Sequence, residues 1–194
     1  MAQVTNILIV GVGGQGTLLA SKLMGRVFTD QGFDVKVSEV HGMSQRGGSV
    51  VTYVRYGDKV FSSLVEKGEA DVVIAFEQLE AARWLPNLKP GGTLIVNTQQ
   101  MDPMPVIMGN AAYPQGILPA IKAMGVNVVD LDALSLAMEA GTAKATNIVL
   151  LGVAARCLGY EPDLWLKAMR ATVPAKTIPV NEKAFALGYA ALER

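Results

Sequence analysis

The sequence is poor in metal-binding side chains, since its 194 residues include one cysteine, Cys157, and one histidine, His41. A single cysteine allows no internal disulfide, which is typical of cytoplasmic proteins. An iron–sulfur cluster needs about four cysteine ligands. A zinc site needs about four protein ligands, or three and a water. We therefore expect this chain to hold neither kind of site by itself.

The chain also lacks an excess of charge and long apolar runs. It carries 17 basic and 17 acidic residues, so its net charge does not favour nucleic acid. No apolar run approaches the ~18–20 residues of a membrane span, and residues 1–6 lack the basic start of a signal peptide. We expect a cytoplasmic protein that binds neither nucleic acid nor membrane. Its 51% apolar content indicates a large core or a subunit interface, and leaves a homodimer of the isolated chain as an open expectation.

Two common catalytic motifs are missing. The sequence contains no G-x-x-x-x-G-K-[ST] loop, which disfavours a P-loop nucleotidase. It contains no G-x-S-x-G elbow of the α/β-hydrolases. The sequence therefore favours neither a P-loop nucleotidase nor an α/β-hydrolase.

The N-terminal half of the sequence contains the glycine-rich motif Gly-Val-Gly-Gly-Gln-Gly at residues 11–16, called the glycine loop below. It follows an apolar strand-like run and precedes a helix-like one, as in the first βα unit of a doubly wound sheet. A helix N-terminus after such a loop favours an anion. The candidate residues of an anion or nucleotide site are Gly11, Gly13, Gly14, Gln15 and Gly16.

Glu39 is the candidate ribose ligand of that site. It stands near the end of the second predicted strand, where dinucleotide-binding proteins place an acidic residue. It follows Gly11 by 28 positions, which is longer than the usual interval of about 20. Whether the glycine loop binds a dinucleotide or only builds the fold stays open at this point.

Hydrophobic periodicity predicts one α/β domain over residues 1–194. The predicted fold is Rossmann-like and doubly wound, with a mainly parallel sheet, an inserted β-hairpin and a helical C-terminal cap. Strands are expected at residues 6–10, 34–40, 71–76, 93–97 and 126–131, with the hairpin at 49–56 and 59–63 and a short strand at 105–108. Helices are expected at residues 14–31, 77–85, 117–124, 132–139, 146–155, 162–171 and 180–192.

Residues 41–48, His-Gly-Met-Ser-Gln-Arg-Gly-Gly, form the most unusual segment. It directly follows a predicted core strand, and loops at carboxyl ends of parallel strands line the binding crevice of such sheets. Its polar side chains and glycines favour contact with a ligand or partner over a simple connector. A catalytic role for His41 is less favoured, because the sequence places no second acid or nucleophile beside it. For Glu77, at a strand end, we favour a charge that complements a helix dipole.

Three segments together resemble the gamma-type subunit of 2-oxoacid:ferredoxin oxidoreductases, the pyruvate/ketoisovalerate oxidoreductase gamma family. They are the glycine loop, residues 39–48 and residues 70–77. Asn147, residues 150–152 and residues 181–185 extend the resemblance over nearly the whole chain. The 41–48 segment is its most specific part, and the pattern is most similar to the indolepyruvate-acting members.

The resemblance implies the oxidative decarboxylation of a 2-oxoacid, such as indolepyruvate, to an acyl-coenzyme A with reduction of ferredoxin. In this family thiamine diphosphate and the iron–sulfur clusters lie on other subunits or domains, and coenzyme A is a co-substrate of the complex. This agrees with the single cysteine. The chain also lacks the Gly-Asp-Gly and downstream Asn-Asn pattern of a thiamine diphosphate site.

We therefore expect a structural and substrate-access subunit that packs against the thiamine-bearing subunit, reaches ferredoxin through the complex and is inactive alone. No residue is predicted to be catalytic. The predicted contact surface, near the shared active site or the coenzyme A path, comprises His41, Ser44, Gln45, Arg46, Gly47 and Gly48. Two alternatives remain: a stand-alone NAD(P)- or flavin-dependent oxidoreductase, and a nucleotide-sensing regulatory module.

Overall fold

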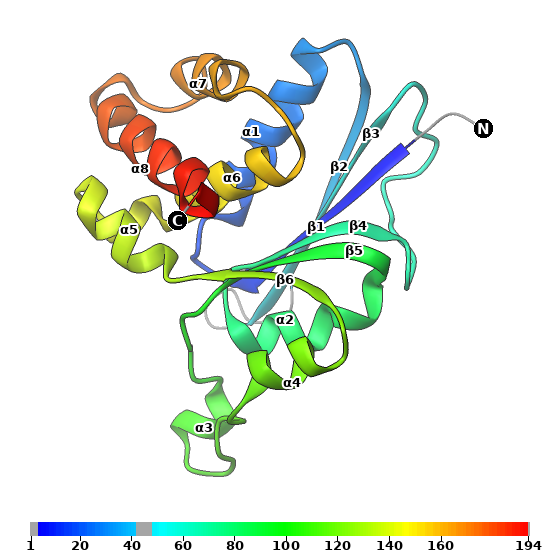
Figure 1. Cartoon of the computed structure of the whole chain (residues 1–194), viewed down its shortest axis with the longest axis vertical. Helices are drawn as coiled ribbons and strands as arrows, with labels where there is room; N and C mark the ends of the chain where they lie inside the picture. The colour runs from blue at the N-terminus through cyan, green and yellow to red at the C-terminus, as the bar shows by residue number, and fades with distance from the viewer. Residues whose placement is uncertain (1–3, 42–47, 194) are drawn as a thin grey trace.

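The protein, seen here as a computed structural model that describes residues 4–41 and 48–193, is built on one six-stranded mixed sheet (Figure 1). The strand order is β2-β3-β1-β4-β5-β6. β1, β4, β5 and β6 run parallel, whereas β3 is antiparallel to both of its neighbours. The strands are β1 Val4–Val12, β2 Asp34–His41, β3 Ser49–Gly57, β4 Ala70–Ala75, β5 Leu88–Asn97 and β6 Asn127–Leu131.

Helices cover both faces of the sheet (Figure 1). One face carries α1 Thr17–Asp30, α5 Ala133–Ala140, α6 Thr146–Cys157, α7 Pro162–Arg170 and α8 Ile178–Ala190. The other carries α2 Gln78–Trp84 and α4 Ile117–Ala123, while the one-turn helix α3 Met104–Ile107 projects away from the sheet. Short 3₁₀ turns are η1 Leu85–Asn87, η2 Ala143–Ala145, η3 Ala175–Thr177 and η4 Ala191–Glu193. The predicted α/β fold class and the helical C-terminal cap are confirmed.

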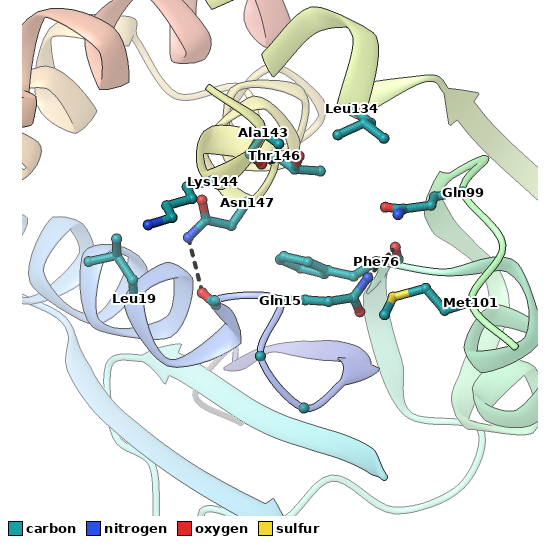
Figure 2. Close-up of a pocket in the computed structure, with 13 residues that line it drawn as sticks. Gln15, Leu19, Phe76, Gln99, Met101, Leu134, Ala143, Lys144, Thr146 and Asn147 are labelled. Carbon is teal, nitrogen blue, oxygen red and sulfur yellow. Dashed lines mark hydrogen bonds between the residues drawn. The ribbon is translucent and has the colours of Figure 1, made fainter. Parts of the chain in front are cut away.

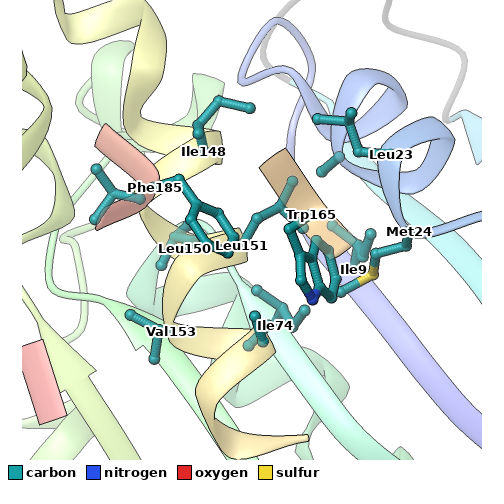
Figure 3. Close-up of a cluster of buried hydrophobic side chains, with 14 of the residues drawn as sticks. Ile9, Leu23, Met24, Ile74, Ile148, Leu150, Leu151, Val153, Trp165 and Phe185 are labelled. Carbon is teal, nitrogen blue, oxygen red and sulfur yellow. The ribbon is translucent and has the colours of Figure 1, made fainter. Parts of the chain in front are cut away.

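Strand alternation divides the core into two layers. Ile7 and Ile9 of β1 belong to the cluster under α1, α6 and α8, whereas Leu8 and Val10 belong to the cluster under α2 and α4. Successive side chains of a strand point to opposite faces, so β1 supplies both layers. Figure 3 shows the first cluster, in which Trp165 of α7 lies among side chains of α1, β1 and α6.

α6 is the buried helix that its apolar sequence predicts. Its residues from Asn147 to Ala155 are buried, and it crosses α8 at two glycines. A Cβ atom on Gly152 would overlap the carbonyl of Phe185, and one on Gly188 would overlap the carbonyl of Val149. The two backbones can therefore approach only because neither residue has a side chain.

Two predicted strands are wrong. Residues 59–63 form no strand, so β3 pairs with β2 and β1 rather than with a hairpin partner of its own. The amide of Val60 donates to Asp34 Oδ2 at 2.9 Å, so it bonds to a side chain rather than to a neighbouring strand. Val60 is buried, whereas Phe61 is 90% exposed. Residues 105–108 are not a strand either: α3 starts with Pro105 in its first turn, where a missing N–H costs nothing.

Among the described residues, none of the helices has the length and apolar character that a membrane crossing requires.

Candidate functional site

The glycine loop lies at the carboxyl end of β1 and turns the chain into α1. Gly16 is the N-cap of α1 with φ 85°, and Gly14 has φ 100°, values that L side chains rarely adopt. Three of the loop's amides already have protein partners. Val12 N–H donates to Gln15 Oε1 at 2.7 Å, Gly13 N–H to Gly48 O at 3.0 Å, and Gln15 N–H to Val12 O at 3.2 Å. The loop is therefore fixed by the fold before any ligand is present.

Gln15 connects this loop to the end of β4. Its Nε2 donates to the carbonyl of Phe76 at 3.1 Å, while its Oε1 accepts from Val12. A Cβ atom on Gly11 would lie 2.7 Å from Gln15 Oε1 and 3.0 Å from Phe76 Cβ. Gly11 is thus needed because the glutamine side chain and the phenylalanine fill the space beside it.

A pocket of about 590 Å³ opens over the glycine loop (Figure 2). Four consecutive residues of the loop, 13–16, form one wall of the pocket. Its apolar lining comes from Leu19, Phe76, Met101, Leu134 and Ala143. Its other polar lining comes from Gln99, Lys144, Thr146 and Asn147. The pocket therefore combines apolar walls with polar groups from the glycine loop, from the segment after β5 and from the start of α6.

The electrostatics of this pocket favour an anion. The first turn of α1 has neither a side-chain cap nor an acidic residue. The first turn of α6 has no acidic residue either, but α6 continues from η2, where Thr142 caps the start and Ala143 O accepts from Thr146 N–H. Lys144 precedes α6 and lines the pocket, and none of the described lining residues is acidic. Free amides at a helix start carry a partial positive charge that stabilises a negative group. The described walls thus offer positive potential without a competing carboxylate.

Asn147 joins the two helix starts. Its Nδ2 donates to Gly16 O at 3.1 Å, and a Cβ atom on Gly16 would lie only 2.7 Å from that nitrogen. Asn147 is 2% exposed, and its Oδ1 has no hydrogen-bond partner among the described residues. Buried polar atoms are nearly always hydrogen-bonded, so this orphaned acceptor marks the junction as unusual.

A buried carboxylate supports the far side of the pocket. Glu77 is 1% exposed and caps α2 by accepting from Glu80 N–H at 2.9 Å. Its other oxygen accepts from Met101 N–H at 3.3 Å and from the Tyr113 hydroxyl. Burial, and then the hydrogen bond to Glu77, raise the pKa of Tyr113 above its ordinary value of 10.0. Glu77 thus caps α2 from just before its first turn, where the sequence favoured a charge that complements the helix dipole, and it also fixes the chain at Met101.

The structure brings some of the predicted site residues together and separates others. Gly13, Gly14, Gln15 and Gly16 line the pocket, and Gly11 lies buried beside it. Glu39 lies on β2, which is separated from β1 by the whole of β3, and it is not among the lining residues. Two strand spacings amount to about 10 Å. The arrangement therefore does not place Glu39 as a ribose ligand beside the glycine loop.

The 41–48 segment is described only at its two ends. His41 ends β2, and the carbonyl of Gly48 accepts from Gly13 N–H in the glycine loop. Ser44, Gln45, Arg46 and Gly47 lie outside the described residues. The two segments singled out from the sequence therefore meet in space at Gly48.

Sequence reasoning did not assign Lys144, Gln99 and Leu134 to a site. Their pattern is ordinary for a loop or a helix start. Gln99 comes just after β5, whereas Leu134 and Lys144 reach the glycine loop only because the chain returns there between β6 and α6. The available signal was the Gly-Thr pair at residues 141–142, which is typical of a turn followed by a helix start. Thr142 does cap η2 there, because its Oγ1 accepts from Lys144 N–H at 3.3 Å. Within residues 4–41 and 48–193, no group of three His, Cys, Asp or Glu side chains could hold a metal ion.

Comparisons with known proteins cover nearly the whole chain. Residues 6–191 match the family model "Pyruvate ferredoxin/flavodoxin oxidoreductase". The chain is 44% identical to the indolepyruvate oxidoreductase subunit IorB of Thermococcus kodakarensis, over 94% of this chain and 93% of that protein. It is 37% identical to the subunit of the same name from Methanothermobacter thermautotrophicus, over 96% of both chains.

Two solved structures share the fold. The gamma subunit of a keto/oxoacid ferredoxin oxidoreductase from Geobacter sulfurreducens superposes with a TM-score of 0.74 at 24% identity, covering 98% of this chain and 99% of that one. A 2-oxoglutarate:ferredoxin oxidoreductase from Magnetococcus marinus, solved with 2-oxoglutarate, coenzyme A and succinyl-coenzyme A bound, gives a TM-score of 0.75 at 18% identity. The match covers 98% of this chain and 31% of that one, so the same fold also occurs as part of a longer chain.

Proposed function

Since the chain belongs to the pyruvate ferredoxin/flavodoxin oxidoreductase family and is a gamma-type subunit of its 2-oxoacid oxidoreductases, we propose that it completes an enzyme acting on indolepyruvate. The observation that carries the proposal is the match to subunits of indolepyruvate oxidoreductases over more than nine-tenths of both chains. In this proposal residues 1–194 form a single domain with this one role.

The proposed reaction belongs to the complex. An aryl 2-oxoacid loses carbon dioxide, two electrons pass to ferredoxin, and coenzyme A takes the acyl group and releases the proton of its thiol. Thiamine diphosphate and iron–sulfur clusters are placed on partner subunits in this proposal. One cysteine supports that placement, because about four thiolates are needed for one cluster.

The pocket over the glycine loop is proposed to bind a phosphate group of a co-substrate, for which coenzyme A is the candidate in this reaction. The chain's residues fit such a group. The uncapped start of α1 and Lys144 provide positive charge, and no described lining residue is acidic. Leu19 and Leu134 offer apolar contact to the rest of the molecule. In this role the chain binds and orients a co-substrate and takes no part in bond making.

The test of this pocket is a titration of the purified chain with coenzyme A and, separately, with inorganic phosphate. Lys144→Gln should raise the dissociation constant for coenzyme A about tenfold, because one charge-assisted contact is lost. Lys176→Gln, an exposed lysine of η3 outside the lining, is the matched control and should change nothing. Equal affinity of the Lys144 variant and the parent would refute the assignment.

The 41–48 segment is proposed as the contact with the thiamine-bearing subunit, near the shared active site. The proposal is supported by the tie between Gly48 and Gly13, which puts the end of this segment at the mouth of the pocket. His41→Ala and Arg46→Ala should weaken assembly or acyl-coenzyme A formation when both subunits are co-expressed. If assembly and product formation both stay at the parent level, this contact role is wrong.

A stand-alone NAD(P)- or flavin-dependent oxidoreductase gains no support from the geometry, because β3 separates Glu39 from the glycine loop. A nucleotide-sensing module would use the same pocket without turnover. The absorption spectrum of the isolated chain, followed by titration with NAD(H), NADP(H), FAD and AMP, separates these functions. A colourless chain without turnover, which gains activity on addition of the thiamine-bearing subunit, is the expected result.

A further inference from the structure

Glu80, in the first turn of α2, is a buried carboxylate that the proposed function does not yet use. Its side chain is 2% exposed. Charged side chains are almost never so deeply buried unless they are paired. Its Oε1 lies 2.5 Å from Arg83 Nη1, and its Oε2 accepts a hydrogen bond of 2.5 Å from the Ser49 hydroxyl. Both carboxylate oxygens therefore have a partner.

The pair with Arg83 does not account for the burial. Arg83 follows Glu80 by three residues on the same helix, and its side chain is 46% exposed. Such a pair forms equally well on a solvated helix face. The contact that requires Glu80 to point inward is the one with Ser49, a residue 31 positions away in the sequence.

Ser49 is the first residue of β3, and it lies opposite Val12, the last residue of β1. Next to it, the carbonyl of Gly48 accepts from Gly13 N–H at 3.0 Å. The point at which the chain re-enters the sheet is thus tied to α2 through Ser49 and to the glycine loop through Gly48. The described residues Gly13, Gly48, Ser49 and Glu80 form one continuous chain of contacts.

We propose that Glu80 is a positioning residue that holds the start of β3 against the glycine loop. It keeps Gly48 bonded to Gly13 and so sets where the chain leaves the rim of the pocket. The inference rests on the proposed function for its consequence, because that function assigns the preceding 41–48 segment to the partner subunit. We call the conformation in which Gly48 is bonded to Gly13 the anchored conformation. If the partner binds only this conformation, its apparent affinity falls as the fraction of molecules in the anchored conformation falls.

The hydrogen bond between Ser49 and Glu80 can be removed with little other change. Ser49→Ala deletes the hydroxyl, and Ser49→Thr restores it on a residue that favours strands. A bond to a charged group typically changes an equilibrium about tenfold or more. Ser135→Ala is the matched control, because Ser135 donates an equivalent 2.5 Å bond to Asp132 on the surface of α5.

The first measurement is hydrogen exchange of the Gly13 amide in the isolated chain, with the melting temperature as the check on folding. Ser49→Ala should speed exchange at Gly13 about tenfold, Ser49→Thr should return it to within about twofold of the parent, and Ser135→Ala should leave it unchanged. Glu80→Gln, which keeps the shape and loses the charge, should give an intermediate rate. Unchanged exchange at Gly13 in Ser49→Ala overturns the inference.

The second measurement is the dissociation constant for the thiamine-bearing subunit, which a merely structural bond would leave unmoved. Ser49→Ala should raise it about tenfold, and Ser49→Thr should restore it. Faster exchange at Gly13 with unchanged affinity overturns the positioning role. A parent chain that does not bind the subunit at all refutes the proposed function instead, and the exchange result still decides whether Glu80 fixes this part of the chain.

Discussion

At the residue scale, Gly16 meets two separate requirements. Its φ of 85° is a conformation that a residue with a Cβ adopts at a cost of about 1–2 kcal/mol. A Cβ atom there would also lie 2.7 Å from the side-chain nitrogen Nδ2 of Asn147, which is shorter than the contacts that Cβ atoms make in folded proteins. The first requirement is local, and the second comes from a residue 131 positions away.

Gly16→Ala should therefore destabilise the protein by about 2–4 kcal/mol, the sum of the backbone cost and the overlap. Gly32→Ala separates the two terms, because Gly32 has φ 86° and open space around it, and it should cost about 1–2 kcal/mol. The measurement is the free energy of unfolding from urea titration. If the two substitutions lower the free energy of unfolding equally, steric overlap with Asn147 does not contribute at Gly16.

Tyr113 provides a pH test of the buried network around Glu77. Burial raises its pKa in the folded protein above the ordinary 10.0, and burial does the same for Tyr160. A raised pKa means that the folded state keeps the proton that the unfolded state loses. The stability is fully present below pH 10 and falls as the pH rises above it.

Between pH 10 and pH 11 the free energy of unfolding should fall by about 1 kcal/mol for each such tyrosine. Replacing Tyr113 by Phe should lower the stability at neutral pH by about 1–3 kcal/mol, because Glu77 and the amide of Leu79 each lose a partner. The same variant should show a shallower decline above pH 10. Parallel stability curves of the variant and the parent would contradict the assignment.

At the scale of elements, the crossing of α6 and α8 gives the clearest prediction. Gly152→Ala or Gly188→Ala would drive a Cβ atom into backbone carbonyls that cannot move aside, so each should cost about 3 kcal/mol or more. Gly25→Ala is the matched control inside α1. Its Cβ would lie 3.6 Å from Val37 Cγ2, an ordinary contact, and the gain in helix propensity should stabilise by up to about 1 kcal/mol.

The check is again the free energy of unfolding, with circular dichroism to compare helix content. Stability of the Gly152 and Gly188 variants within about 1 kcal/mol of the parent would mean that the two helices can separate without loss.

The elements that could be predicted from the sequence are those whose hydrophobic period decides them. The strands around Ile7 and Ile74 and the apolar helix at α6 were predicted to within a few residues. The strand predictions at residues 59–63 and 105–108 were wrong. A run of four or five alternating or apolar residues is too short to distinguish a strand from a loop or a helical turn. The position of β3 between β2 and β1 depends on long-range pairing that no local pattern contains.

The same limit applies to the site. The glycine loop was found because its spacing is a local signal, and residues 13–16 do line the pocket. Lys144 and Asn147 belong to the pocket because the chain returns there more than 120 residues later, and the helix start beside them does not indicate which loop they will face. Glu39 was placed correctly on a strand from the sequence. Its distance from the glycine loop could not be predicted, because it depends on the order of the strands in the sheet.

At the scale of the whole molecule, the features described above gather at one end of the sheet. The pocket, the end of the 41–48 segment at Gly48 and the projecting helix α3 all follow carboxyl ends of β1, β2 and β5. Ile107 and Met108 at α3 are 66% and 65% exposed, so apolar surface is available to a partner there. These features are consistent with a subunit whose function depends on what it binds.

The most direct test of that claim is indolepyruvate-dependent reduction of ferredoxin by the thiamine-bearing subunit, expressed with and without this chain. We predict that the two subunits co-purify and that acyl-coenzyme A formation and ferredoxin reduction appear only when both are present, while this chain alone is inactive. Full activity of the thiamine-bearing subunit without this chain, or turnover by this chain alone, would contradict the account.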